Sequence, residues 1–163
     1  MSPAETTSLM KLTLYKGPPD DTWHKIGHEA TCLWTSSEYS HCELVFDEVN
    51  SKGRPLCASS SSRDNGVRFK HIDLNSGKWD VYELHVTTEQ IAYAYQWFVT
   101  NQGKPYDHLG LVWFVLPINQ FNDPQKFVCS EAVAAALQFN KPHKYHPQKV
   151  LNTCKEKYRA KVL

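Results

Sequence analysis

The sequence predicts one α+β domain in which an antiparallel sheet packs against helices. Three observations support this class. A chain of 163 residues with 41% hydrophobic content is suited to a single core. Strand-like patterns cluster in the middle of the chain, with helical patterns before and after them, which argues against alternating βαβ units. The links between the strand candidates are short, and short links favour antiparallel pairing.

The N-terminal part is expected to form a strand and then a helix. Residues 12–15 are a short apolar strand that the run Gly17-Pro18-Pro19 closes. Asp20 or Asp21 is placed to cap a helix running to about Trp34, because apolar residues follow at helical spacing.

Four strand candidates follow in close succession, separated by turn-forming residues. The links contain Asn and Gly, and the Asn65-Gly66 pair accepts positive φ angles. The candidates are residues 40–47, 56–60, 66–72 and 79–86.

The chain then becomes helical. Thr87 or Thr88 is expected to cap a helix that runs to about Thr100. Thr88 does not form a full capping box with the residues that follow it. The residues expected to face inward are Ile91, Tyr95, Phe98 and Val99. Further elements are an apolar segment at 109–116, a helix from Cys129 to about Phe139 and a last helix over about 147–159.

Composition restricts the setting of the protein. Residues 1–8 are polar and lack the apolar region of a signal peptide, and no apolar run approaches the roughly 18 residues of a membrane span. We therefore expect a cytoplasmic protein without a transmembrane segment. An odd number of cysteines without close pairing indicates free thiols in a reducing compartment; they are Cys32, Cys42, Cys57, Cys129 and Cys154.

Charge is distributed unevenly along the chain. Residues 141–163 carry seven Lys/Arg against one acid, a net of +6, and residues 1–140 carry eleven against sixteen, a net of −5. We interpret the basic end as a solvated surface helix, with contact to an acidic partner, nucleic acid or a membrane surface as alternatives. No basic repeats rich in aromatic residues occur, so nucleic-acid binding is not expected.

Cys129 lies where an apolar lead-in, Phe127-Val128, meets the helical run that follows. The free N–H groups and the dipole of a helix N-terminus favour negative charge and lower a thiol's pKa. Cys129 is therefore a candidate nucleophile if the fold brings a histidine to it. The alternative is an inert buried cysteine.

His41 is the best candidate for that histidine. Period-two alternation places Cys42, Leu44 and Phe46 on the core face of its strand, and His41 and Glu43 on the other face. Two residues along a strand span roughly 6.6 Å, a distance that a glutamate can bridge to an imidazole. Glu43 would then hold the tautomer and stabilise the imidazolium. A solvent-facing His–Glu pair is the alternative.

Three segments carry a resemblance to a known family. In order they are Ser40-His41-Cys42-Glu43-Leu44-Val45, Pro105-Tyr106-Asp107-His108-Leu109-Gly110 and Phe127-Val128-Cys129-Ser130-Glu131. They resemble the circularly permuted branch of the NlpC/P60 papain-like superfamily, which includes YiiX-like amidases and the lecithin–retinol acyltransferase relatives. In that branch the histidine strand precedes the nucleophile helix, as here. The resemblance covers most of residues 10–140, and other segments are similar to small phage- and bacteria-borne members, for which association with a virion or host cell is an alternative location.

The resemblance implies a permuted papain-like fold. We expect residues 1–163 to form a single such domain, with residues 1–10 flexible and residues 141–163 as a basic C-terminal helix or tail. It implies Cys129 as nucleophile and His41 as general base, with Tyr106 and Asp107 shaping the pocket before the thiol. We also assign Ser40 and Ser130 to substrate binding.

The third polar residue departs from the family pattern. In many members it lies on the strand after the histidine strand, where this chain offers Cys57 and the serines at 59–62. We therefore predict Glu43 for this role, with Ser59 and Ser60 as alternatives. The Cys129 backbone N–H is expected to belong to the oxyanion hole.

These roles predict a cysteine hydrolase of the amidase or peptidase type that works through a thioester acyl-enzyme. The alternatives are a lipid acyl hydrolase or acyltransferase of the same fold, and a catalytically silent domain that binds a peptide, lipid or protein in the same cleft. The oligomeric state is not predicted.

No cofactor and no metal are expected. His24, His28 and Cys32 align on one helix face, but Lys25 stands where a zincin helix needs glutamate, so surface histidines are the default interpretation. There is no phosphate-binding glycine loop. Arg63 and Arg68 are candidates for holding a substrate carboxylate.

Overall fold

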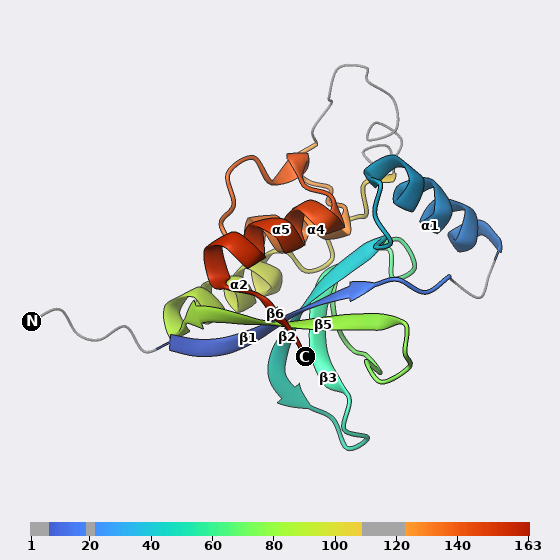
Figure 1. Ribbon diagram of the computed structural model, residues 1–163. Coiled ribbons are helices and arrows are strands. Elements are labelled where there is room, and N and C mark those ends of the chain that lie inside the picture. Colours follow the sequence, from blue (N-terminus) through green and yellow to red (C-terminus); the bar gives the residue numbers. More distant parts are fainter. Residues whose placement is uncertain (1–6, 19–21, 109–122) are drawn as a thin grey trace, which may run out of the picture.

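The computed structural model describes residues 7–18, 22–108 and 123–163, and in it a six-stranded antiparallel sheet carries helices on one face (Figure 1). The strand order is β4-β3-β2-β1-β5-β6, so β1 lies between β2 and β5. The mixed, antiparallel architecture is consistent with the predicted α+β class. The strands are β1 (Thr7–Tyr15), β2 (His41–Val49), β3 (Pro55–Ser61), β4 (Gly66–His71), β5 (Trp79–Thr87) and β6 (Lys161–Val162).

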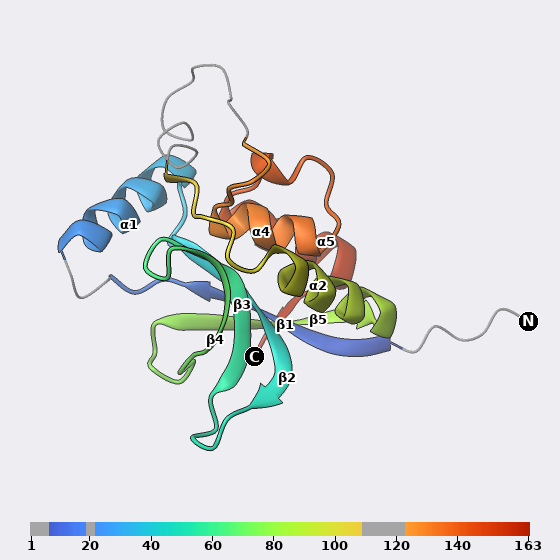
Figure 2. The ribbon, with the colours of Figure 1, turned by 180° about the vertical axis from the view of Figure 1, so that it is seen from behind.

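Four α-helices and one short 3₁₀ helix lie within the described ranges. Figures 1 and 2 show α2, α4 and α5 together over one face of the sheet, with α1 apart from them beyond one end. α4 packs against both α2 and α5 and against β2 and β3. The helices are α1 (Thr22–Thr35), α2 (Thr88–Asn101), α4 (Cys129–Ala136) and α5 (Pro147–Tyr158), with η1 at Pro142–Lys144.

The core lies between the sheet and these three helices. Alternation on β2 places Cys42, Leu44 and Phe46 in it, as predicted. α4 is almost wholly buried because its alanines let α2 and α5 approach closely. α5 instead is amphipathic, since it buries Val150 and Leu151 and directs its lysines outward. The basic C-terminal part is therefore a packed helix with a charged outer face.

The predicted strands are confirmed to within a few residues, with two differences. β1 begins at Thr7, five residues before the expected strand, because its whole length pairs with β5. β6 was not predicted. It has only two residues, both exposed, and its partner on β5 is defined by tertiary structure alone.

The helix ends confirm one predicted cap and correct one predicted boundary. Thr87 is the N-cap of α2, and it forms a full capping box with Gln90, because the box has to be counted from Thr87 and not from Thr88. α4 ends at Ala136, before the expected Phe139, since Gln138 adopts a positive φ of 57°. The Phe139 N–H then bonds the Ala134 carbonyl, which satisfies an orphan acceptor of the last turn.

The inward face of α2 also differs from the prediction. Ala94, Phe98 and Asn101 are buried, whereas Tyr95 and Val99 are more than 40% exposed. The buried stripe is therefore rotated by about one residue from the one that hydrophobicity alone predicts.

The apolar side chains of Ile26 and Leu33 on α1 do not pack into the core, since they are 54% and 82% exposed. The apolar segment expected at 109–116 lies outside the described residues. Within the described residues, no helix combines the length and the apolar character needed to cross a membrane.

Candidate active site

Cys129 is the first residue of α4 and lies at its N-terminal end, as the sequence predicts. Val128 is the N-cap, in extended conformation, and the Val128 carbonyl accepts the N–H of Ala132. The Cys129 side chain is 5% exposed and points into the region shared with β2. Its position combines the favourable field of a helix N-terminus with near-complete burial.

His41 and Glu43 alternate along β2 with the core residues Cys42 and Leu44, so they lie on its other face, and they are in direct contact. The Nε2 of His41 is 2.8 Å from Oε1 of Glu43. The carboxylate is 1% exposed, while the imidazole keeps 21% of its surface open. With Nε2 engaged by the carboxylate, Nδ1 is the nitrogen left for the thiol, an orientation suited to a base held by an acid.

The electrostatics favour an imidazolium on His41. Burial would lower the pKa of His41, but the charge of Cys129 and hydrogen bonds to Cys129 and Glu43 raise it to about 9. Burial likewise acts to raise the pKa of Glu43, which the Arg68 charge and the His41 hydrogen bond nevertheless hold below its usual range.

The Cys129 thiol has a pKa well below its usual range. The largest cause is a hydrogen bond from the Cys42 thiol, and burial opposes it; the charge of His41 and a hydrogen bond with its ring lower the pKa further. The pair is therefore expected to rest as thiolate and imidazolium near neutral pH. The pKa of each other cysteine is instead raised by burial.

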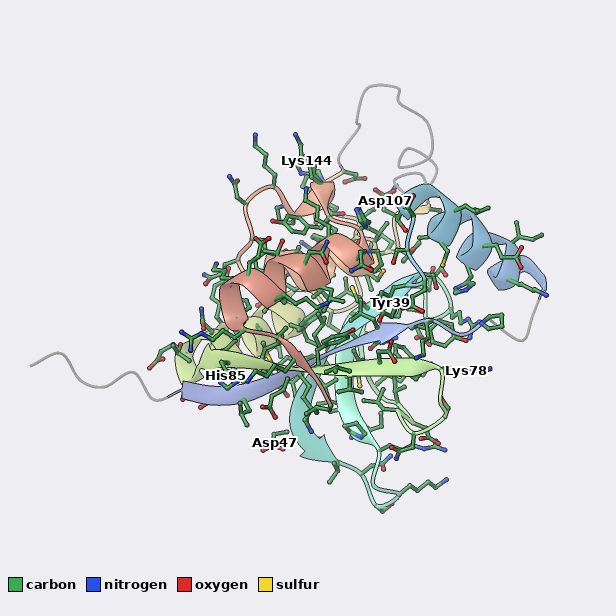
Figure 3. The ribbon with its side chains drawn as sticks, in the orientation of Figure 1. Tyr39, Asp47, Lys78, His85, Asp107 and Lys144 are labelled. Atoms are coloured by element: carbon green, nitrogen blue, oxygen red, sulfur yellow. The ribbon has the colours of Figure 1, made fainter. Side chains whose placement is uncertain are left out.

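Tyr106 and Asp107 lie beside the start of α4. Tyr106 bridges to Phe127, and the Asp107 N–H donates to the Phe127 carbonyl at 3.2 Å. Both side chains are buried, and burial together with the charge of Cys129 raises the pKa of the Tyr106 phenol. Figure 3 shows Asp107 on the side of the molecule where α1 lies. The structure thus places this segment beside the N-terminal end of α4, near enough for the charge of Cys129 to act on the phenol.

The four serines of the prediction have different positions. Ser40 hydrogen-bonds the His28 ring at the mouth of the site. Ser130 donates to the Tyr145 carbonyl at 2.7 Å and so makes a structural contact. Ser59 and Ser60, the alternatives for the third polar residue, donate to the Cys42 and Phe127 carbonyls respectively. Glu43 is the residue that the structure brings to His41.

A cavity of about 480 Å³ opens beside His41. One wall is aromatic: Trp79 and Tyr15 meet edge to face at 4.9 Å between ring centroids, and the Trp79 centroid is 6.2 Å from that of His41. Another wall is charged and comes from β4 and the turn before it. Tyr106 also lines the cavity, so the cavity reaches the segment beside Cys129.

The metal and carboxylate hypotheses gain no support from the described side chains. His28 lies near Cys32 and Ser40, but within the described ranges no three His, Cys, Asp or Glu side chains are grouped to hold a metal ion. Arg68 donates to Glu43 and Asp64, so these carboxylates of the protein already engage its guanidinium.

Sequence reasoning missed three residues of the site. Cys42 was placed in the core, but its hydrogen bond to Cys129 was not foreseen. Glu131 is buried in the first turn of α4, and burial raises its pKa to about 7. Arg68 was given a different role. Of these three residues, only Glu131 had a signal in the sequence, because a glutamate at the third position of a helix often caps the N-terminus.

No protein-family model matches the chain, and a search of curated proteins gives no significant match. The class of protein is therefore argued from the fold and the site alone.

Proposed function

We propose that this protein is a cysteine-dependent hydrolase of the amidase or peptidase type, with Cys129 as nucleophile and His41 as its acid–base partner. The observation that carries the proposal is the position of His41, which contacts the buried Glu43 carboxylate at 2.8 Å and is near enough to Cys129 for each to shift the other's pKa. A nucleophile, a base and a group that orients the base are the parts that covalent acyl transfer requires.

The proposed reaction begins with the thiolate of Cys129 attacking the carbonyl carbon of an amide. The proton of the thiol has already passed to His41, and the imidazolium gives it to the leaving amine as the C–N bond breaks. A thioester on Cys129 remains. Water then loses a proton to His41 and attacks the thioester, which releases the acid and restores the pair of thiolate and imidazolium.

Charge on the tetrahedral intermediate requires donors next to Cys129. The first-turn N–H groups of α4 lack intrahelical acceptors and lie at the positive end of the helix dipole. We assign the Cys129 N–H to this role, because the amide is already held in place by the helix. The cavity beside His41 is proposed to receive the substrate, with Trp79 and Tyr15 as its apolar wall.

We also propose that the fold is a permuted papain-like one. Support comes from the order of the elements, in which the histidine strand β2 precedes the nucleophile helix α4, and from the antiparallel sheet on which α4 packs.

The test compares iodoacetamide labelling of all five cysteines against pH, by peptide mass spectrometry. We expect Cys129 to react fastest at pH 6–7, and His41→Ala to slow it by about tenfold or more, since one unit of thiol pKa changes the thiolate fraction tenfold. Cys32 is the internal reference because it is more exposed. His85→Ala, on the far end of β5, is the matched control.

Turnover separates an enzyme from a binding module. With 4-nitrophenyl acetate we expect an acetyl group on Cys129 that hydroxylamine removes, and no adduct in Cys129→Ala. The catalytic proposal fails if Cys129 labels no faster than Cys32. Fast labelling without any acyl adduct would instead favour a domain that binds its ligand in the same cleft.

A further inference from the structure

Arg68 is a nearly buried guanidinium whose donors are directed at two carboxylates. Its Nη1 donates to Oε2 of Glu43 at 2.7 Å and its Nη2 to Oε1 at 2.6 Å, the two parallel bonds of a bidentate pair. Its Nε donates to Oδ2 of Asp64 at 2.8 Å. Only 13% of the side chain is exposed. The group is therefore held within the protein by three hydrogen bonds to two carboxylates.

The sheet explains how Arg68 on β4 reaches Glu43 on β2, two strands away. Arg68 is the cross-strand partner of Ser59 on β3, and Leu44 is the partner of Ala58. Continuing the β2–β3 register by one residue places Ser59 beside Glu43. Cross-strand neighbours share a face, so the three form one row across the sheet. The small Ser59 leaves room for the guanidinium to pass over β3.

Glu43 has both oxygens engaged in this row. Oε1 accepts from His41 and from Arg68, and Oε2 accepts from Arg68. A carboxylate that is 1% exposed is costly unless it is paired and hydrogen-bonded. Arg68 provides that pairing, and without it the carboxylate would tend to take up a proton.

Asp64 fixes Arg68 from the other side. It lies in the turn between β3 and β4 and accepts from Lys70 at 2.7 Å as well as from Arg68. These hydrogen bonds and charges overcome burial and hold the pKa of Asp64 at about 2. The guanidinium is thus positioned by two acids and has little rotational freedom.

We propose that Arg68 is a positioning residue for the reactive pair: by fixing both oxygens of Glu43, it holds the His41 ring with Nδ1 toward Cys129. This inference rests on the proposed function, and it assigns to Arg68 no contact with substrate. The His41 imidazolium then keeps the ionised Glu43 beside it down to low pH. The Cys129 thiolate in turn keeps the imidazolium as its partner.

The test is the pH profile of Cys129 labelling in Arg68→Met. Two sets of ionisable groups can affect this profile. Those in and beside the charged row are Arg68, Glu43, Asp64 and His41, and those around the thiol are Cys42 and Tyr106. We expect the acid limb to move up by about one pH unit, and labelling at pH 6 to fall about tenfold, since Glu43 would be protonated in that range.

Two other variants make the effect specific. Arg68→Lys keeps the charge but cannot make the bidentate pair, so we expect a smaller shift in the same direction. Arg54→Met removes the same charge from the exposed turn before β3, and we expect a wild-type profile. If Arg68→Met does not fold, as far-UV circular dichroism would show, the profile of Arg68→Lys decides, and an unshifted profile overturns the inference.

A double variant tests whether Arg68 acts through Glu43. In a Glu43→Gln background, Arg68→Met should add no further shift, because the charge that it positions has gone. An equal shift in both backgrounds would overturn the inference. Wild-type fast labelling that His41→Ala abolishes but Arg68→Met leaves unchanged would also overturn it while the proposed function stands. Slow wild-type labelling would contradict the proposed function itself.

Discussion

At Leu44 and Glu43 the two faces of β2 are equally buried but have opposite chemistry. On the helix side, Leu44 is fully buried among hydrocarbon side chains. On the other side, Glu43 is 1% exposed and is surrounded by donors from His41 and Arg68. One strand thus separates an apolar core from a charged network, and Cys129 reaches the junction between them from α4.

The difference shows how stability and chemistry are divided in this fold. Apolar burial is non-directional and contributes in proportion to area, so the helix side can supply most of the folding free energy. Burying the ion pairs costs desolvation that only well-aligned partners offset, so the network contributes orientation more than stability. Changes on the helix side should therefore alter unfolding, and changes in the network should alter thiol reactivity.

The largest stability effect is expected for Phe98→Ala on α2. Phe98 is fully buried and packs edge to face with Phe46 and Trp97. Loss of the ring leaves a cavity, and we expect the free energy of unfolding in urea to fall by about 3–5 kcal/mol. Tyr93→Ala, on the same helix but 45% exposed, is the control, with less than about 1 kcal/mol expected.

Labelling Cys129 of the same variant under native conditions tests whether the helix side and the charged network are independent. The folded fraction of Phe98→Ala should keep the wild-type pH profile of Cys129, because the ring packs against the aromatic rings of Phe46, Phe69 and Trp97. A shifted acid limb would show that the helix side and the network are not separate.

The apolar side was also the more predictable of the two. Alternation on β2 was enough to place Leu44 in the core and His41 beside Glu43, and the helix junction was enough to single out Cys129. The pairing of Arg68 with Glu43 depends on the register of three strands, which a sequence does not specify. Likewise, alternation predicts that Cys42 is buried but not that its thiol lies against Cys129, since that contact depends on how α4 docks.

Gly66→Ala should have the next largest effect, at the point where the charged face joins the Tyr106 segment. Gly66 has φ of +135°, and an added Cβ would lie 2.0 Å from the Lys104 carbonyl oxygen. The neighbouring Val67 N–H bonds that same oxygen at 2.9 Å. We expect the free energy of unfolding to fall by about 2–3 kcal/mol, from backbone strain and the clash together.

Gly53→Ala is the matched control for the strain alone. Gly53 also has positive φ, +70°, but nothing lies within 4 Å of its added Cβ. We expect a loss of about 1 kcal/mol there. Equal losses at both glycines would show that the close approach of Lys104 to β4 contributes nothing to stability. The Tyr106 segment and the charged face would then not be coupled through Gly66.

The smallest effect concerns Glu131, a buried acid on the apolar side of the junction. Burial raises its pKa to about 7, and the nearby Asp107 charge adds to the rise, against a hydrogen bond from the Val128 backbone. Between the unfolded pKa near 4.5 and about 7, the folded state holds a proton that the unfolded state has lost, so stability falls as pH rises through this window.

Glu131→Gln removes this titration and keeps an acceptor for the Val128 N–H. We expect it to be more stable than wild type by about 2 kcal/mol at pH 8, allowing for solvent screening, with the difference vanishing near pH 4 in parallel urea titrations. A difference independent of pH would mean that Glu131 is ionised in the fold, and that the apolar side tolerates a charge next to the Cys129 thiolate.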